Sequence, residues 1–567
     1  MDPETPSRPQ TLPESWWRFL ERAAVVLLLI LATVPRARDL DSSFDRGFEG
    51  YQGAFFAIAA VNYERLGVGA FGGYPILNVD LPGGSLETAK QRPAEWLTYH
   101  NHPPTTPLLA WSALHWMGPE GWAEAWREGR SPRGVEIALR LPFLLLHLAG
   151  LLALWWLARV AFGTQVALLA LALMTTLPVS ALYGTLVNYE NPSLVFALLA
   201  VGCYGAHVRS ARKRHLVGMG LALGVGCAVT FAPAFFLPPL VLRSAWRRRW
   251  REAFSVGLVG GLACAVPLLL HDAWARHSLA AIGKAPLSIQ SRAEVLLQPL
   301  FDGSMPIWDW LDAQWQHSGS AIGVPLVIAG LAGFALCAAR ALSSRMDGRL
   351  RALEWPRSAH TDVDLALPLL LGGSTYLLAF YRHTGEEQWP FLLYLAPGAA
   401  LLAARAVHQL SGPLQRLRGG TAPLVLVAAT LALPGLVRFE AWRFANRAPG
   451  PRDDTALEAG PDAPLPLTVG DSLAQLLPAG SVGFTPTQLG LNPASTWYAW
   501  RSLLPISAPD DPTPRAIADA VGLGAAARYL VVPVDPPPAA RRALESFQEN
   551  LGPPDVRTAT WLAWKCR

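Results

Sequence analysis

The chain has 567 residues, of which 51% are hydrophobic and only 16% charged, with a formal net charge of +5 at pH 7. Soluble domains carry about 25% charged residues, so this composition excludes an ordinary soluble enzyme, and the small positive charge gives no reason to expect a nucleic-acid partner. Apolar runs long enough to cross a hydrocarbon core of about 30 Å recur along the sequence. The five cysteines show neither a disulfide framework nor a metal-type spacing. The sequence therefore predicts a mainly α, polytopic transmembrane protein.

The amino-terminal segment combines a polar tail with the first apolar run. Residues 1–15 are polar and rich in proline, so we expect a disordered cytoplasmic tail. The run at 23–34 is short for a membrane crossing, but Trp16 and Trp17 extend it backwards. A cleaved signal peptide is the alternative interpretation, and no small-x-small cleavage site follows the run. These features favour a retained helix.

Apolar runs and basic clusters together predict the topology. The runs lie at roughly 17–35, 139–158, 165–183, 192–208, 216–242, 254–271, 322–341, 363–381, 390–406 and 421–438. Cytoplasmic loops are enriched in Lys and Arg, and every arginine-rich cluster lies inside only if 216–242 enters and leaves on one side. The prolines of "TFAPAFFLPP" favour two short helices that meet near Pro233. The prediction is eleven crossings, with the amino terminus inside and the carboxyl terminus outside.

This topology places five segments on one outer face: the loop 36–138, the short loop 184–191, the loop 272–321, the segment 381–389 and a tail from about 443. The chemically unusual residues of the chain fall in these segments. Ionisable groups at membrane depth are costly, so their grouping on one face indicates a functional site there.

The first outer loop opens with "SSFDRGFEGYQGAFF", which places Asp45, Arg46 and Glu49 directly after a membrane crossing. Glu49 lies one helical turn from Asp45, and we expect it to position the site or to pair with Arg46. Beside these polar residues the stretch holds Phe55 and Phe56, among other apolar side chains. This mixture predicts an amphipathic helix that lies at the membrane interface.

The same loop later carries "YHNHPPTTPLLAWSALHW", in which His100 and His102 precede Pro103 and Pro104. The two prolines fix a rigid turn before a predicted helix at 105–116. A His-x-His pair can bind a metal, but no third ligand at helical spacing accompanies it. Histidines hydrogen-bonded at the membrane surface are the simpler interpretation, and we expect no metal site.

Charged residues occur at two further outer helix ends. Glu190, in "NYENP", is either an ordinary helix-end charge or part of a site shared with Asp45. Arg382 and His383, in "RHTGEEQWPFLLYLAP", belong either to a solvated helix end or to a site for an anionic lipid head group, because Arg and His pair with phosphate.

Five segments, taken in order, resemble the bacterial GT-C glycosyltransferases, which are similar to the protein O-mannosyltransferase and aminoarabinose-transferase superfamily. They read "FDRGFEGYQGAFFAIAAVNYERLG", "YHNHPPTTPLLA", "ALRLPFLLLHLAGLLALWWLARVAFG", "YGTLVNYENPSLVFALLA" and "RHTGEEQWPFLLYLAPGAALLAA". Their order, spacing and common sidedness carry the likeness, which covers roughly residues 18–440. It implies a catalytic transmembrane domain at 16–440 that moves a sugar from a polyprenyl-phosphate-linked donor. The acceptor, a glycan, lipid or protein, would lie at the outer face of the bacterial cytoplasmic (inner) membrane.

The resemblance further implies inversion at the anomeric carbon and no nucleotide-sugar donor. We expect no cofactor, and a divalent metal is not indicated. Asp45 matches the acidic residue of the first outer loop that activates the acceptor hydroxyl, and Glu190 matches the acidic residue of the second outer loop. We therefore expect Asp45 and Glu190 to be the two catalytic residues. His102 matches a His-Pro-Pro motif near the site, and we group His100 with it as a substrate-binding candidate. His383 matches a late polar position where a helix begins again.

Two features of the enzymes that this chain resembles are absent from its sequence. Many of them have a Lys near the outer end of the fifth crossing, where this chain reads "AVTFAPAF". Arg382, His383 or Lys284 would have to replace it as the phosphate ligand. There is also no WWDYG motif, which disfavours the oligosaccharyltransferase branch and weakens the case for a divalent metal.

The tail at 443–567 differs in composition from the rest of the chain. It is rich in proline and holds three strand-like stretches, "GSVGFTP", "RYLVVPVD" and "TATWLAWKC", with a helix-like "RAIADAVGLGAAA" before the second. This alternation predicts a small α/β domain outside the membrane.

Two other functions fit parts of the sequence. A transporter or flippase for a lipid-linked glycan would be expected to carry polar groups through the middle of its helices and to show an inverted repeat. The apolar runs here are nearly free of charge, and no repeat is visible. A non-catalytic envelope assembly protein would be distinguished by a dispensable Asp45.

Overall fold

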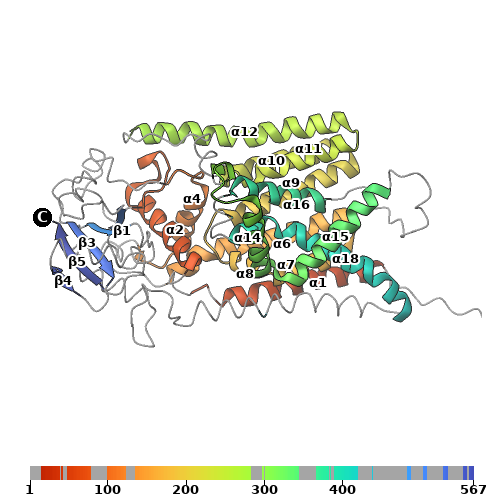
Figure 1. Cartoon of the computed structure of the whole chain (residues 1–567), viewed down its shortest axis with the longest axis horizontal. Helices are drawn as coiled ribbons and strands as arrows, with labels where there is room; N and C mark the ends of the chain where they lie inside the picture. The colour runs from red at the N-terminus through yellow and green to blue at the C-terminus, as the bar shows by residue number, and fades with distance from the viewer. Residues whose placement is uncertain are drawn as a thin grey trace, which may run out of the picture.

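A computed structural model of the chain describes residues 14–38, 40–41, 47–77, 99–122, 134–281, 297–298, 300–343, 365–381, 384, 389–418, 437, 482–486, 502–506, 528–533, 553–557 and 561–566. These residues are mainly helical, and a small β-sheet lies at one end of the long axis (Figure 1). The helical bundle occupies the rest of the molecule, as the apolar runs predict.

The first part of the bundle consists of helices that pack into one core: α1 (Glu14–Ala37), α6 (Val135–Phe162), α7 (Thr164–Thr176), α8 (Pro178–Tyr183) and α9 (Glu190–Ser210). Gly163 alone separates α6 from α7 and has a φ of 86°, which glycine adopts without strain. The run predicted as one helix at 165–183 is interrupted before Pro178. Leu177 is extended there, because the residue before a proline is biased away from helical geometry.

The next part confirms the predicted break in 216–242. It consists of α10 (Lys213–Val229), the 3-10 helix η4 (Ala232–Phe236), α11 (Leu237–Trp246) and α12 (Trp250–Ala281). Helix α12 meets α11 in antiparallel order and α10 in parallel order, as these pairs show: Gly257–Val241, Gly260–Leu237, Gly220–Val259 and Gly224–Ala263. The chain therefore turns back at η4, and α10 begins on the side of the bundle where α11 ends.

The last part of the bundle consists of α14 (Ile307–Ser318), the π-helical turn η5 (Gly319–Gly323), α15 (Val324–Ser343), α16 (Ala366–Ala379), the 3-10 helix η6 (Trp389–Tyr394) and α18 (Ala396–Arg418). Helices α14 and α15 are continuous through η5, so this helix begins before the apolar run predicted at 322–341. Gly333 of α15 lies against the backbone of Leu402 in α18, an approach that a side chain would prevent.

The long loop at 36–138, which is predicted to lie outside, contains helices of its own. It contains α2 (Gly47–Leu66), the 3-10 helix η1 (Val68–Phe71) and α4 (Thr105–Met117), and α4 confirms the helix predicted after the two prolines. The prediction that α2 is an amphipathic interface helix is wrong. Residues 53–63 are all buried, which covers every side of three helical turns. Because α2 packs against both α4 and α6, it forms the core of an outer layer.

Five strands form a mixed sheet in the order β2-β1-β3-β5-β4. They are β1 (Val482–Pro486), β2 (Ser502–Ile506), β3 (Arg528–Pro533), β4 (Val556–Arg557) and β5 (Trp561–Cys566). Strand β1 is parallel to β2 and β3, and β5 is antiparallel to β3 and β4. Strands β1, β3 and β5 confirm the three predicted stretches, whereas the helix predicted at 515–527 lies outside the described residues. The boundaries of a separate domain at 443–567 remain a prediction.

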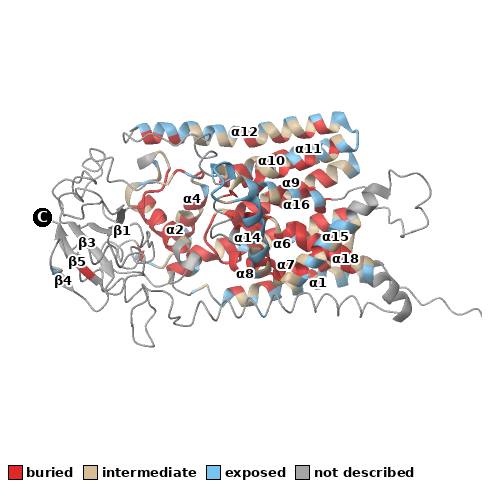
Figure 2. Cartoon of the chain, in the orientation of Figure 1, coloured by how far each residue is buried: buried red, intermediate tan, exposed pale blue. Residues whose placement is uncertain are grey.

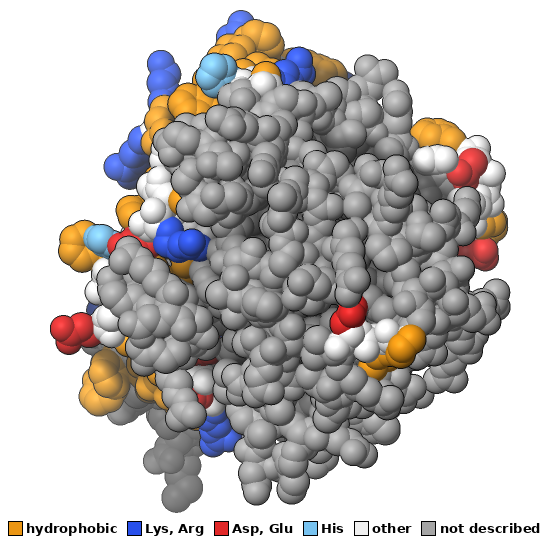
Figure 3. All heavy atoms as spheres, turned by 90° about the vertical axis from the view of Figure 1, so that its left-hand side faces the viewer, with side chains coloured by type: hydrophobic (Ala, Val, Ile, Leu, Met, Phe, Trp, Pro, Cys, Tyr) orange, Lys and Arg blue, Asp and Glu red, His pale blue; other side chains and the backbone are white. Residues whose placement is uncertain are grey.

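Four described helices are long and apolar enough to cross a membrane: Val135–Phe162, Glu190–Ser210, Trp250–Ala280 and Ile307–Leu336. The most apolar stretch of the third is only 22% buried, and α12 is correspondingly exposed along much of its length (Figure 2). Figure 3 looks along the long axis from the sheet end, and hydrophobic side chains lie on several sides of the rim. These features are those of a membrane protein. The count of eleven crossings remains a prediction.

Candidate functional site at the outer helix ends

The start of α9 places a carboxylate in the protein interior. Glu190 is the first residue of this helix and is 2% exposed. Acidic groups are favourable at a helix amino terminus, where the macrodipole is positive. Its Oε2 has no hydrogen-bond partner among the described residues. A buried carboxylate oxygen without a partner is costly. We therefore expect this oxygen to bind a ligand or to carry a proton.

Tyrosines surround this carboxylate. Tyr183, Tyr376 and Tyr394 are buried and interact electrostatically with Glu190. The Tyr394 hydroxyl lies 2.6 Å from Ser193 Oγ, which donates to the Glu190 carbonyl at 2.9 Å. The Tyr183 hydroxyl has no hydrogen-bond partner among the described residues. The surroundings of Glu190 are therefore aromatic, and they include one buried hydroxyl, that of Tyr183, to which the described residues offer no hydrogen-bond partner.

The two predicted histidines lie on the turn before α4, and one of them contacts the residue that precedes Glu190. His102 is buried, and its Nδ1 lies 3.0 Å from the Thr230 hydroxyl, at the break between α10 and η4. Its ring is stacked between Tyr189, at 3.7 Å between centroids, and Phe231, at 4.9 Å. The structure thus brings the His-Pro-Pro turn against the residue that precedes Glu190. It also brings the turn against the region where the expected Lys is absent.

Tyr189 and His100 have further aromatic and polar neighbours. Burial raises the pKa of the Tyr189 phenol well above its ordinary value, and the neighbouring Tyr99 and Glu190 add to the shift. Tyr189 therefore stays neutral and can donate a hydrogen bond at any physiological pH. The ring of His100 lies 4.6 Å from that of Tyr74, whose hydroxyl lies 2.6 Å from Nδ1 of His271 on α12.

Two buried arginines near the same helix ends were not singled out as site residues by the sequence. Arg36, at the end of α1, is 2% exposed and donates to the carbonyls of Ala32 and Thr175 and to Ser180 Oγ. Arg140 of α6 is 1% exposed and donates to the Leu40 carbonyl. A guanidinium inside an apolar run is costly in a membrane. Arg140 lies inside the apolar run at 139–158, so that cost was the sequence signal that could have identified it, whereas Arg36 directly follows the run at 17–35.

A buried polar chain connects Arg36 to the start of α9. Ser180 Oγ lies 3.4 Å from His147 Nε2, and His147 Nδ1 lies 3.3 Å from Asn191 Oδ1. Asn191 also donates to the Phe143 carbonyl at 2.9 Å and is the residue next to Glu190. These contacts tie α1, α6, α8 and α9 together behind the carboxylate and hold its position.

The remaining predicted residues lie in parts that the structure leaves undescribed. Asp45, Lys284, Arg382 and His383 are outside the described residues, and Glu49 belongs to the first turn of α2 with a side chain that is likewise outside them. Next to His383, Thr384 is described and buried. It accepts a hydrogen bond from Trp310 Nε1 at 3.0 Å on its hydroxyl, and one from Gln314 at 2.7 Å on its carbonyl.

The described residues contain no group of three or more His, Cys, Asp or Glu side chains that could hold a metal ion. His100 and His102 instead take part in aromatic stacking, and Nδ1 of His102 also contacts a hydroxyl. This arrangement places a buried carboxylate beside neutral hydroxyls and aromatic rings. Such a set can orient a sugar and accept or hold a proton.

Comparisons with known proteins agree with this architecture. The sequence profile of the family described as dolichyl-phosphate-mannose-protein mannosyltransferase matches residues 133–271. No curated protein matches the chain by sequence. Among solved structures, the fold is similar to that of ArnT from Cupriavidus metallidurans bound to undecaprenyl phosphate, with a TM-score of 0.54 at 13% identity, over 98% of this chain and 99% of that one.

Two structures of an archaeal enzyme are similar as well. The apo oligosaccharyltransferase of Archaeoglobus fulgidus has a TM-score of 0.56 at 13% identity, over 92% of this chain and 70% of that one. The same organism's AglB, in complex with an inhibitory peptide and a dolichol-phosphate, has a TM-score of 0.54 at 12% identity, over 91% and 69% of the two chains. At these identities the likeness is one of fold, and it confirms the resemblance to GT-C glycosyltransferases at that level.

Proposed function

We propose that the chain is a membrane glycosyltransferase that transfers a sugar from a polyprenyl-phosphate-linked donor to an acceptor at the outer face of the bacterial inner membrane. The observation that carries the proposal is the buried, partly unpartnered carboxylate of Glu190, set among aromatic side chains at the outer helix ends. The fold supports it, since the similar ArnT and AglB structures contain undecaprenyl phosphate and dolichol-phosphate. The sugar acceptor, whether glycan, lipid or protein, is left open.

The proposed reaction is a single displacement that inverts the anomeric carbon. The carboxylate of Asp45 removes the proton of the acceptor hydroxyl as the oxygen bonds to the anomeric carbon, and the bond from that carbon to the phosphate oxygen breaks. A phosphate is a good leaving group, so the reaction needs no strong general acid. The protein has to orient two substrates and to balance the charge of the phosphate, and rigid helix ends suit that task.

The other residues receive supporting roles in this proposal. Glu190 is the second catalytic carboxylate and, with the tyrosines around it, orients the sugar. His100 and His102 bind the substrate from the neighbouring turn. Arg382, His383 or Lys284 pairs with the donor phosphate, in place of the Lys that this chain lacks. Glu49 positions the site or pairs with Arg46. We propose no cofactor and no metal requirement.

The direct test is transfer by the purified full chain. Incubation with a polyprenyl-phosphate-linked sugar and an envelope extract should release polyprenyl phosphate, and mass spectrometry should find the sugar on an acceptor. Envelope glycans of cells with and without the protein should differ by the same sugar. Uptake of the lipid-linked glycan into vesicles, without release of the carrier phosphate, would instead establish a transporter or flippase.

A further inference from the structure

The end of the bundle away from the sheet carries two short turns with an excess of positive charge. One turn joins α9 to α10 and the other joins α11 to α12, and the second is visible at the end of the bundle in Figure 1. We call residues 209–214 and 247–251 the basic turns. We propose that the basic turns bind the head groups of anionic phospholipids, in the leaflet opposite the proposed transfer site.

The charge balance of this region is strongly one-sided. Between residues 204 and 252 the sequence holds nine Lys and Arg side chains and a single carboxylate, that of Glu252. Eight of the nine are exposed on the basic turns: Arg209, Arg212, Lys213, Arg214, Arg247, Arg248, Arg249 and Arg251. A surface of this kind attracts phosphate groups.

Both turns hold their basic side chains in a defined geometry. Ala211 has a φ of 54° and Arg248 a φ of 57°, so each chain reverses through one left-handed residue. The first turn is closed by hydrogen bonds from Ala211 N to the His207 carbonyl, at 2.7 Å, and between His207 Nδ1 and the Arg212 carbonyl, at 3.2 Å. In the second, Arg248 N donates to the Ala245 carbonyl at 2.8 Å. Both turns are short and closed by hydrogen bonds, so they hold their basic side chains at the surface.

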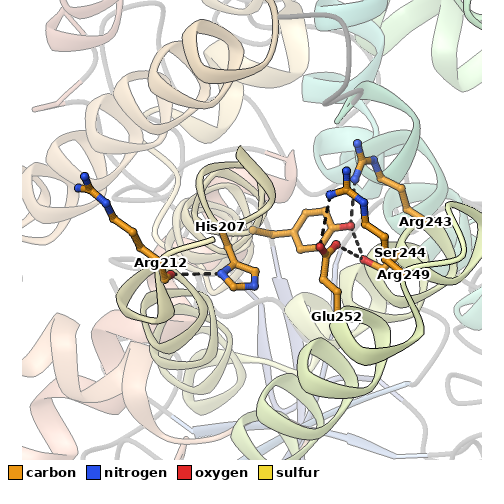
Figure 4. A network of polar contacts seen from close by, with 7 residues as sticks. His207, Arg212, Arg243, Ser244, Arg249 and Glu252 are labelled. Atoms are coloured by element: carbon orange, nitrogen blue, oxygen red, sulfur yellow. Dashed lines mark hydrogen bonds and ion pairs between the residues drawn. The ribbon is translucent and has the colours of Figure 1, made fainter. Parts of the chain in front are cut away.

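The single carboxylate of this region, that of Glu252, belongs to a polar network next to the turns (Figure 4). Glu252 Oε1 accepts from Ser244 Oγ at 2.8 Å, and Oε2 lies 3.5 Å from Arg249 Nη1. Ser244 in turn lies 2.7 Å from the Tyr204 hydroxyl, to which Arg243 donates at 3.1 Å. Both oxygens of Glu252 are thus engaged inside the protein. No described carboxylate lies within ion-pair distance of the other exposed cations of the basic turns.

The surface next to the second turn is apolar, and this favours a phospholipid as the partner. Leu242 and Trp246 lie one turn apart on α11, and Trp250, Phe254 and Leu258 follow at the same spacing on α12; all five are exposed. Tryptophan is enriched at the membrane interface, where an apolar ring meets polar head groups. A phospholipid fits both features, with its phosphate at the arginines and its acyl chains along the apolar row. An acidic protein or a nucleic acid would match the charge alone.

The competing explanation is that these arginines only fix the orientation of the chain during insertion. The test therefore uses the purified full chain in detergent, where orientation has no effect. Native mass spectrometry would compare the binding of phosphatidylglycerol with that of phosphatidylcholine of the same acyl composition. The variants are R247Q/R248Q/R251Q and, with the charge kept, R247K/R248K/R251K. The control is Arg276→Gln, which removes an exposed Arg near the other end of α12.

Each cation near an anionic lipid surface strengthens binding about fivefold, so three together should give a preference for phosphatidylglycerol of about a hundredfold. We expect this preference to fall severalfold or more in the Gln variant and to persist in the Lys variant and in Arg276→Gln. Equal binding of the two lipids by the wild-type chain, or an unchanged preference in the Gln variant, would overturn the proposal. Displacement of the lipid by an equimolar acidic peptide would assign the surface to a protein instead. No step of this measurement needs sugar transfer, so its outcome is independent of the proposed reaction.

Discussion

The side chain of Arg36 lies directly over the α-carbon of Gly184, so that a methyl group built on Gly184 would overlap its Cδ and Nε. Gly184 opens the short loop that leads to Glu190, and Arg36 lies in the last turn of α1, the helix that precedes Asp45. One contact therefore connects the two segments that lead to the predicted acidic residues. Gly184 has a φ of −61° and a ψ of −28°, so a side chain there would be excluded by space and not by backbone strain.

We predict that Gly184→Ala lowers the free energy of unfolding by about 1–3 kcal/mol, the usual cost of overpacking a filled interior. The matched control is Gly261→Ala on α12, where a methyl group would meet no atom within 4 Å. That substitution should be neutral or stabilising by up to about 1 kcal/mol, because alanine favours a helix. Thermal and denaturant unfolding in detergent would measure both.

The cause can be isolated with a double-mutant cycle. In an Arg36→Ala background the overlapping side chain is gone, so Gly184→Ala should cost little there, and the two effects should be non-additive. An equal loss in both backgrounds would show that Arg36 is not the obstacle.

The second prediction concerns the proposed base. Asp45→Asn preserves shape and hydrogen bonding but cannot accept the acceptor proton, so transfer should fall by about 10²–10⁴, the usual contribution of general-base catalysis. Expression and donor affinity should stay close to wild type. Glu49→Gln, four residues further along the sequence, is the control and should lose less. Near-normal turnover of Asp45→Asn beside an inactive Glu49→Gln would mean that the base is misassigned.

The third prediction concerns the contact between His102 and Thr230. Thr230→Val keeps the shape of the side chain and removes the hydroxyl that lies 3.0 Å from Nδ1 of His102. A buried polar group that loses its partner costs about 1–3 kcal/mol, and the ring would also lose part of its orientation. We expect lower thermal stability and a higher KM for the donor. Thr230→Ser keeps the hydroxyl and should restore both values; if it does not, the methyl group matters more than the hydrogen bond.

The fourth prediction concerns orientation in the membrane. In a background without reactive native cysteines, Asn101→Cys should react with an impermeant thiol reagent added from outside intact cells. Lys213→Cys and Arg247→Cys, on the basic turns, should react only after the membrane is opened. All three positions are exposed, whereas Glu190 is buried and would be a poor labelling position. Labelling of Lys213→Cys from outside would contradict the predicted topology.

The sequence by itself determined the class of the protein, because membrane crossing depends on local properties. Apolar length sets whether a helix can span the bilayer, and closely spaced prolines favour a break, so the break near Pro233 was predictable. Single prolines do not have this effect here, since Pro142 and Pro267 lie inside α6 and α12. The helix after Pro104 and the strands "GSVGFTP", "RYLVVPVD" and "TATWLAWKC" were predictable as well. The acidic residue at the start of α9 was visible too, as an ionisable group beside an apolar run.

The tertiary structure decided what surrounds each of these residues. Helix α2 has the mixed composition of an interface helix, yet it is buried, because α4 and α6 lie against it. His102 meets Thr230 across 128 residues, and Arg36 meets Ser180 across 144. Composition and spacing report only on neighbours along the chain, whereas burial and hydrogen bonding depend on which distant segments the fold brings together. For that reason the candidate residues could be named from the sequence, but the neighbours of Glu190 and the contacts of Arg36 could not.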